Sequence, residues 1–218
     1  MSIKAIIFDL DGTLVDSIHD IARCGNEALT SLGFPTHSVD TYKALVGDGL
    51  AGLARKALPT DKREEATITK LIDIYRTLYA AKWSATTRPY PGITKLLADI
   101  SARGIKLAVL SNKSDDFTKM CVEQLLPARV FAEVRGESIG TPKKPDPQGA
   151  LEVAATMEVG PGRCLFVGDS EIDLETARRA GMEFVAVDWG YRSRAELEEA
   201  GARRFISAPG ELLQYVQD

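Results

Sequence analysis

Hydrophobic residues follow two different patterns in the first part of the chain. Residues 4–10 form a short, nearly continuous apolar run, which is typical of a β-strand covered on both faces. Between residues 17 and 82 the apolar positions recur with the spacing of amphipathic helices, and breaks at 33–35 and 58–60 divide that segment. The pattern therefore predicts one strand followed by a block of about four helices.

The rest of the chain alternates between the two patterns. After the segment 89–92, strands are predicted at 105–110, 130–134, 164–167 and 184–187, with a last strand and helix within 203–216. Helices are predicted between them at 93–102, 117–125, 145–157 and 172–180. This alternation indicates an α/β fold, in which a parallel sheet carries helices on both of its faces.

The early helical block interrupts the alternation, which indicates a second domain. We expect a Rossmann-like parallel-sheet core formed by residues 1–16 and 84–218. Residues 17–83 are expected to form a four-helix cap domain inserted directly after the first strand.

Composition excludes several classes of function. The 218-residue chain has 27 Lys and Arg against 31 Asp and Glu, and a net charge of −4 gives no broad attraction to nucleic acid or anionic membranes. No apolar run is long enough to span a bilayer, and the first strand starts too early for a signal peptide. Three widely separated cysteines suggest reduced thiols, so we expect a cytoplasmic protein; its oligomeric state is left open.

Polar side chains follow several of the predicted strands. Asp9 and Asp11 come after the first strand, Ser111-Asn112-Lys113 after the second, and Asp169 and Asp188 after later ones. Parallel sheets bind ligands at the carboxyl ends of their strands, and continued strand geometry would point Asp9 and Asp11 to the same side. A lone Asp-Gly after a strand is usually a turn, but clustered carboxylates without His or Cys favour a bound Mg²⁺.

Four short motifs at these positions resemble those of the haloacid dehalogenase superfamily. They are Phe8 to Leu14 (FDLDGTL), Ser111-Asn112-Lys113, Lys144-Pro145-Asp146-Pro147, and Gly168 to Asp173 (GDSEID), in that order. The resemblance covers the whole expected core, and the helical insert is similar to the four-helix cap of that superfamily. The subgroup that the chain resembles most is that of the phosphoglycolate-phosphatase-like enzymes.

The resemblance implies a magnesium-dependent phosphatase that acts on a small-molecule phosphate ester, with neither nucleic acid nor membrane as a partner. Asp9 would be the nucleophile, and Asp11 would donate a proton to the leaving oxygen and later take one from water. Asp9, the main-chain carbonyl of Asp11, Asp169 and, directly or through a second contact, Asp173 would hold Mg²⁺.

The same resemblance assigns the remaining residues that would contact the phosphoryl group. The Ser111 hydroxyl and the Asn112 main-chain N–H would donate hydrogen bonds to its oxygens, and Lys144 would place a cation beside the nucleophile. Lys143 is adjacent, but the lysine of the family motif directly precedes the proline, which we expect to open a helix at its first position.

The segment Gly47 to Gly52 matches the GxGxxG pattern of dinucleotide-binding loops. The residues before it are predicted as a helix, whereas that pattern requires a strand, so we interpret the segment as a loop between cap helices. Gly47, Asp48 and Gly49 are predicted to contact the substrate, and Arg55 is predicted to meet a substrate anion, with a solvated surface arginine as an equal alternative.

Other activities are weighed against the same positions. Asp11 argues against a dehalogenase, Ile21 occupies the position where capped mutases carry a histidine, and no lysine between Lys4 and Lys43 could form a Schiff base. A sugar-phosphate phosphatase or phosphomutase, a nucleotidase or a pyrophosphatase of the same fold stays open. A non-catalytic receiver-like phosphoacceptor module is a more distant alternative, because receivers lack an inserted cap.

Overall fold

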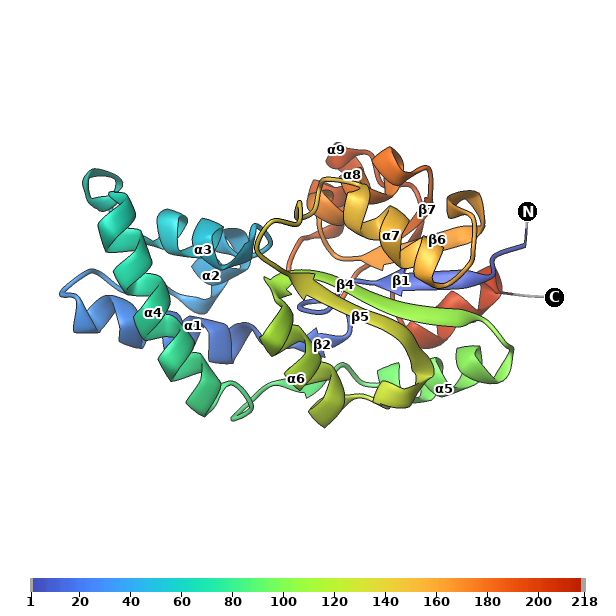
Figure 1. Ribbon diagram of the computed structural model, residues 1–218, viewed down its shortest axis with the longest axis horizontal. Coiled ribbons are helices and arrows are strands. Elements are labelled where there is room, and N and C mark those ends of the chain that lie inside the picture. The colour runs from blue at the N-terminus through green and yellow to red at the C-terminus, as the bar shows by residue number, and fades with distance from the viewer. Residues whose placement is uncertain (1, 217–218) are drawn as a thin grey trace. The chain divides into compact units, whose positions relative to one another are not determined.

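The apolar run near the start of the chain forms a central strand of a six-stranded sheet in the computed structural model, which describes residues 2–216. β1 (Ala5–Phe8) is buried at every position and pairs in parallel with β4 (Lys106–Ser114) and β6 (Cys164–Gly168). The sheet order is β5-β4-β1-β6-β7-β8, and the outer strands are β5 (Phe131–Glu137), β7 (Glu183–Val187) and β8 (Phe205–Ile206). Each of these strands pairs in parallel with its neighbour (Figure 1).

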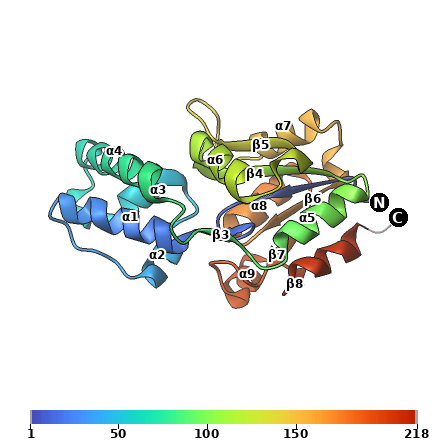
Figure 2. The ribbon, with the colours of Figure 1, turned by 90° about the horizontal axis from the view of Figure 1, so that it is seen from below.

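Helices cover both faces of this sheet. One face carries α5 (Ile93–Ala102), α6 (Asp115–Leu125) and the 3₁₀ helix η4 (Pro209–Tyr215), which Figure 2 shows in front of the strands. The other face carries α7 (Gln148–Thr156) and α8 (Glu171–Ala180), and α9 (Arg194–Ala200) contacts α8. Two short 3₁₀ helices, η2 (Ala128–Val130) and η3 (Pro161–Arg163), precede β5 and β6. The predicted α/β fold with a Rossmann-like parallel sheet is therefore confirmed.

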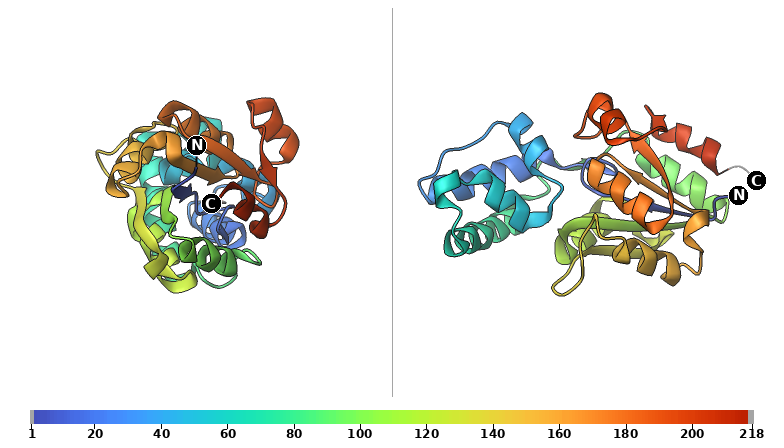
Figure 3. Two further views of the ribbon diagram at one scale, coloured as in Figure 1. Left: turned by 90° about the vertical axis from the view of Figure 1, so that its right-hand side faces the viewer. Right: turned by 90° about the horizontal axis from the view of Figure 1, so that it is seen from above.

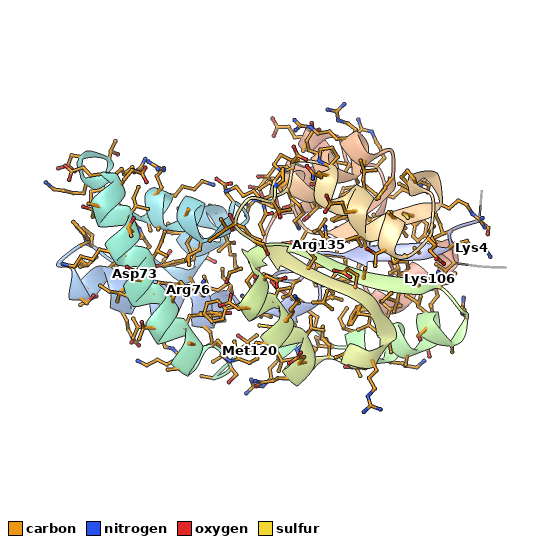
Figure 4. All side chains as sticks on the ribbon, in the orientation of Figure 1. Lys4, Asp73, Arg76, Lys106, Met120 and Arg135 are labelled. Atoms are coloured by element: carbon orange, nitrogen blue, oxygen red, sulfur yellow. The ribbon has the colours of Figure 1, made fainter. Side chains whose placement is uncertain are left out.

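The register of the sheet brings the carboxyl ends of three strands together. Phe8, the last residue of β1, lies opposite Val109 of β4 and Val167 of β6. The residues that follow Phe8 are therefore level with the end of β6 and with the last residues of β4. Lys106, labelled in Figure 4, marks the opposite, amino end of β4.

Residues 16–88 form a second compact unit, which consists mainly of four helices (Figure 3). These are α1 (Ile18–Ser31), α2 (Val39–Leu45), α3 (Gly49–Ala57) and α4 (Glu65–Lys82), with the 3₁₀ helix η1 (Thr60–Lys62) between the last two. Apolar and aromatic side chains form its core: Leu29, Tyr42, Leu53, Leu71, Tyr75, Tyr79 and Trp83. The chain passes between the two units at β2 (Val15–Asp16) and β3 (Arg88–Pro89), which pair with each other.

A buried carboxylate joins the two ends of this helical unit. Asp20 of α1 is fully buried, and its Oδ2 accepts hydrogen bonds of 2.8 Å from the main-chain N–H of Thr86, the N–H of Thr87 and the Thr87 hydroxyl. Arg23 forms an ion pair with the other carboxylate oxygen at 2.9 Å. Because Thr86 and Thr87 are bound to α1, the unit extends to Arg88 rather than ending at the expected residue 83.

Three local features differ from the sequence predictions. The first strand ends at Phe8, before Asp9, because the Leu10 carbonyl accepts main-chain hydrogen bonds from Leu14 and Val15 in a tight turn. β4 continues through Ser114, so the residues expected after this strand belong to it. The helix α9 was not among the predicted elements; it is only seven residues long and begins with a capping box at Ser193.

The expectation that Pro145 opens a helix is wrong. α7 begins at Gln148, with Pro147 as its N-cap residue, and the Lys144–Pro145 peptide bond is cis. The side chain of Asn112 in β4 forms hydrogen bonds with both main-chain groups of Lys144. The residues before α7 are therefore bound to the strand and do not form part of the helix. Asp146 then accepts a hydrogen bond from the Gln148 N–H at 2.9 Å, at the point where the helix starts.

Within residues 2–216, no helix combines the length and the hydrophobicity that crossing a membrane requires.

Candidate active site

Three of the predicted acidic residues lie together at the carboxyl edge of the sheet. Asp9 follows β1, Asp169 follows β6 and Asp173 lies in the first turn of α8. Each offers a carboxylate oxygen, and these oxygens lie within 4.8 Å of one another. All three residues are buried, so their charges are poorly solvated.

A buried lysine lies against this acidic cluster. The Nζ of Lys144 is 2.7 Å from Oδ1 of Asp9 and 2.7 Å from Oδ1 of Asp173, and the residue is 4% exposed. Asn112 positions the lysine, since its side chain accepts from the Lys144 N–H at 2.9 Å and donates to the Lys144 carbonyl at 2.8 Å. Burial opposes the ammonium charge, but Asp173 and Asp9 outweigh burial and raise the pKa of Lys144. The lysine is therefore a cation fixed beside Asp9.

Lys144 does not fully offset the cost of burying the acidic cluster, because the pKa values of two of its carboxyl groups remain raised. Burial raises the pKa of Asp9 to about 7, against the opposing effect of Lys144. Burial and repulsion from Asp9 and Asp173 raise the pKa of Asp169 well above its ordinary value. Three buried carboxyl groups thus face a single ammonium group, and all the candidate ligand atoms are oxygens. This donor set fits a divalent, oxygen-preferring cation such as Mg²⁺.

Asp173 has less freedom than the other two acids to bind a metal. Its Oδ1 accepts from Lys144, and its Oδ2 accepts from the Ser170 hydroxyl at 2.6 Å and the Ser170 N–H at 3.2 Å. Ser170 is the N-cap residue of α8 and accepts a hydrogen bond from the Asp173 N–H in return, which completes a capping box. The geometry favours Asp173 as the residue that orients Lys144.

Asp169 is held by residues that no sequence pattern assigned to it. Its carboxylate accepts hydrogen bonds from the Tyr191 N–H at 2.7 Å and from the Thr13 hydroxyl at 3.3 Å. The main chain also approaches it from two sides, because a Cβ added to Gly12 or Gly190 would lie 2.3 Å or 2.1 Å from Asp169 atoms. Thr13 lies inside the first motif, but nothing in the sequence indicates that Tyr191 would reach Asp169.

Asp11 does not join the acidic cluster through its side chain. Its two carboxylate oxygens each accept from Nζ of Lys113 at 3.0 Å. The expectation that Asp9 and Asp11 point to the same side depended on continued strand geometry, and the turn after Phe8 removes that condition. Metal binding by the main-chain carbonyl of Asp11 stays a prediction.

The other predicted core residues lie at the end of β4. Ser111 and Asn112 are both buried, and the Ser111 hydroxyl accepts a hydrogen bond from the Lys113 N–H at 3.2 Å. Asp188 follows a strand in the same way as Asp169, yet its carboxylate binds Arg194 and Ser207. Position directly after a strand is therefore not enough to predict that a carboxylate belongs to the acidic cluster, because Asp188 has the same position and forms an ion pair instead.

The predicted substrate-binding residues of the insert lie at the start of α3 and within it. Gly47 and Gly49 have positive φ angles of 116° and 70°. Asp48 between them is the N-cap residue of α3, and its Oδ2 lies 3.9 Å from Nζ of Lys56. Arg55 forms an ion pair with Glu65 of α4, and both side chains are at least half exposed. Substrate contact by these residues stays a prediction.

Comparison with known proteins places these features in a family context. Residues 6–187 match the family model described as haloacid dehalogenase-like hydrolase. A phosphoglycolate phosphatase of Aquifex aeolicus is 34% identical over 188 residues, which cover 86% of each chain. One from Pseudomonas syringae pv. tomato is 34% identical over 200 residues, covering 90% of this chain and 73% of the relative. The crystal structure of a predicted phosphoglycolate phosphatase from Haemophilus somnus superposes with a TM-score of 0.92 at 26% identity, covering 100% of this chain and 99% of the other.

Proposed function

The chain belongs to the haloacid dehalogenase-like hydrolases and is a phosphatase, and on that premise we propose that it hydrolyses a small phosphate monoester through an aspartyl phosphate on Asp9. The observation that carries this proposal is that Asp9 contacts a buried lysine and belongs to a buried cluster of three acidic residues. A nucleophile beside a fixed cation, in a place that attracts a divalent metal, is what transfer of an anionic phosphoryl group requires.

Asp9 and Asp11 divide the chemistry between them in the proposed reaction. A carboxylate oxygen of Asp9 attacks phosphorus, the bond to the leaving oxygen breaks, and that oxygen receives a proton from Asp11. Water then attacks phosphorus, its proton passes to Asp11, and the electron pair of the phosphorus–oxygen bond returns to Asp9. Each group ends in the state in which it began.

The remaining residues of the site bind and orient the phosphoryl group. In this proposal, Lys144 stabilises negative charge beside Asp9, and Ser111 and the Asn112 N–H, which belong to β4, donate hydrogen bonds to the phosphoryl oxygens. Asp9, Asp169, the Asp11 carbonyl and, more remotely, Asp173 are the residues that would hold Mg²⁺. The bound ion would neutralise charge on the phosphoryl oxygens and keep Asp9 ionised.

We propose phosphoglycolate as the substrate, because relatives named phosphoglycolate phosphatase match most of the chain. Sugar phosphates, nucleoside monophosphates and pyrophosphate are the competing esters, and the residues of the insert are expected to select among them. A cytoplasmic location is proposed with it, in keeping with three free, buried cysteines.

Phosphate release from a panel of these four classes of ester, with Mg²⁺ and with chelator, tests the proposal. Asp9→Asn should lower kcat by at least about a thousandfold while the fold is kept, since the covalent route is lost. Asp188→Asn is the matched control, because Asp188 also follows a strand but pairs with Arg194 outside the cluster. An Asp9→Asn variant that keeps more than about a tenth of the activity removes Asp9 from the nucleophile role.

The same assay separates the alternatives. A receiver-like module would accept one phosphoryl group per chain and release no phosphate catalytically, whereas a phosphomutase would convert a sugar phosphate into its isomer. Trapping the phosphorylated protein in acid and mapping the modified peptide identifies the acceptor residue. A phosphate on any residue other than Asp9 contradicts the proposed mechanism.

A further inference from the structure

Two buried lysines contact different acidic side chains of the site. Lys144 contacts Asp9 and Asp173, and the third member of that cluster is Asp169. Asp11 instead lies against Lys113, whose Nζ is 3.0 Å from each of its two carboxylate oxygens. Two equal contacts fix the direction of the carboxyl group, because a single contact would leave it free to rotate about the bond.

Lys113 is itself firmly positioned. Its side chain is 8% exposed, and the partner side chain of Asp11 is 17% exposed. Its N–H donates to the Ser111 hydroxyl at 3.2 Å, and its carbonyl accepts from the hydroxyl of Thr118, a buried residue of α6, at 3.1 Å. Both main-chain groups of Lys113 are therefore bound to the core, so the ammonium group approaches Asp11 from a fixed origin.

We propose that Lys113 is a positioning residue that aims the Asp11 carboxyl group at the proton transfers of the reaction. This inference rests on the proposed function, in which Asp11 gives a proton to the leaving oxygen and takes one from water. Lys113 forms no bond with substrate and exchanges no proton in either step. It acts on the rate only through the orientation of Asp11, since general acid–base catalysis depends on the geometry of the proton donor.

The proposal predicts that the loss of activity caused by replacing Lys113 depends on the leaving group of the substrate. An alkyl phosphate such as phosphoglycolate expels a strongly basic oxygen that needs a proton, whereas 4-nitrophenyl phosphate expels a stable anion that does not. Lys113→Met keeps the length and bulk of the side chain and removes the ammonium group. We expect it to lower kcat/KM about 10- to 100-fold on the alkyl ester, and less than about threefold on the aryl ester.

A double-mutant cycle with Asp11→Asn tests whether Lys113 acts through Asp11. When the proton-transferring group is already absent, Lys113→Met should cause a further loss of less than about twofold on the alkyl ester. Lys113→Arg keeps a cation with two donors and should recover most of the lost activity. Lys119→Met is the control, because Lys119 is an exposed lysine of α6 that pairs with Asp115.

Each result decides the matter. Equal losses on the two esters, or an undiminished loss in the Asp11→Asn background, would show that Lys113 binds the phosphoryl group or supports the fold, and the proposal fails. Thermal melting identifies a variant that is merely unstable, and Lys113→Arg with a wild-type melting temperature but no recovery also overturns the proposal. If the wild-type protein with Mg²⁺ releases phosphate from neither ester, the proposed function fails, which is a separate outcome.

Discussion

Replacing Lys144 by methionine tests the electrostatic arrangement of the site most directly. The substitution keeps an unbranched side chain but removes the ammonium group that lies 2.7 Å from both Asp9 and Asp173. Breaking a buried ion pair by removing one partner typically costs about 3–5 kcal/mol, because the remaining charge stays buried without compensation. We expect a destabilisation of that size for the metal-free protein near pH 8, which is above the pKa of about 7 to which burial raises Asp9.

Unfolding in urea with a chelator present measures this cost. With an unfolding slope of about 2 kcal/mol per molar urea, the midpoint should fall by about 1.5–2.5 M. The two tryptophans lie in different units, Trp83 in the helical insert and Trp189 in the core. A Trp83→Phe background therefore makes the fluorescence signal specific to the core. Added Mg²⁺ should restore part of the stability, because a cation again balances the cluster.

Lys143→Met is the matched control for this variant, since it removes the adjacent lysine of the same segment. It should change the stability by less than about 0.5 kcal/mol and leave kcat/KM within about twofold of the wild type. Lys144→Met should lower kcat/KM by at least about a hundredfold. A wild-type urea midpoint for Lys144→Met, or a larger loss of activity for Lys143→Met, would refute both the electrostatic reasoning and the choice of lysine.

Three further predictions concern other parts of the molecule. Asp169→Asn should abolish the increase in melting temperature that Mg²⁺ causes, and a retained increase would contradict this prediction. The substitution should not destabilise the metal-free protein, because it removes the repulsion of Asp169 by Asp9 and Asp173. Arg55→Ala should lower kcat/KM for phosphoglycolate by an amount equivalent to about 1.5–3 kcal/mol and should affect kcat/KM for 4-nitrophenyl phosphate far less. Glu65→Gln breaks the ion pair but keeps the arginine, so it should not lower kcat/KM for phosphoglycolate. Equal losses on both esters for Arg55→Ala would show that Arg55 does not determine specificity. Burial opposes the charge of Asp20, but hydrogen bonds from Thr86 and Thr87 outweigh it and lower its pKa, so its stabilising effect is present above pH 3.8 and is lost as the pH falls through the lower folded value. Asp20→Asn should therefore destabilise the insert by about 3 kcal/mol at pH 7, and the difference from the wild type, followed by Trp83 fluorescence, should shrink below about pH 4; a constant difference would refute the assignment.

The sheet and the positions of its carboxyl ends could be predicted because both depend on periodic features of the sequence. A continuous apolar run identifies a strand covered on both faces, and parallel pairing then brings the ends of neighbouring strands together. The family and the phosphatase class followed from the order of the motifs, and the comparisons confirm both. The helix start at Gln148 was missed because a side chain far away in sequence, Asn112, binds the segment before it.

Apart from Lys144 beside Asp9, the partners of the acidic residues could not be predicted, because they depend on turns rather than on periodicity. Asp9 and Asp11 are two residues apart, yet the turn after Phe8 sends one to Lys144 and the other to Lys113. Tyr191 reaches Asp169 through a loop whose path no hydrophobic pattern describes. The sequence thus identified the acidic residues and, through the motif, the lysine beside Asp9, whereas the contact between Asp11 and Lys113 came only from the structure.

The double role of Asp173 has a consequence for how variants of this protein are screened. One carboxylate both caps the first turn of α8 and contacts Lys144, so folding yield and turnover change together when it is replaced. In a mutational library sorted by expression level alone, Asp173 would be classified as a stability position, and its effect on the nucleophile would go unnoticed. Ser170→Ala weakens the cap but leaves the contact between Asp173 and Lys144 in place, so comparing it with Asp173→Asn separates the contribution to heat resistance from the contribution to turnover.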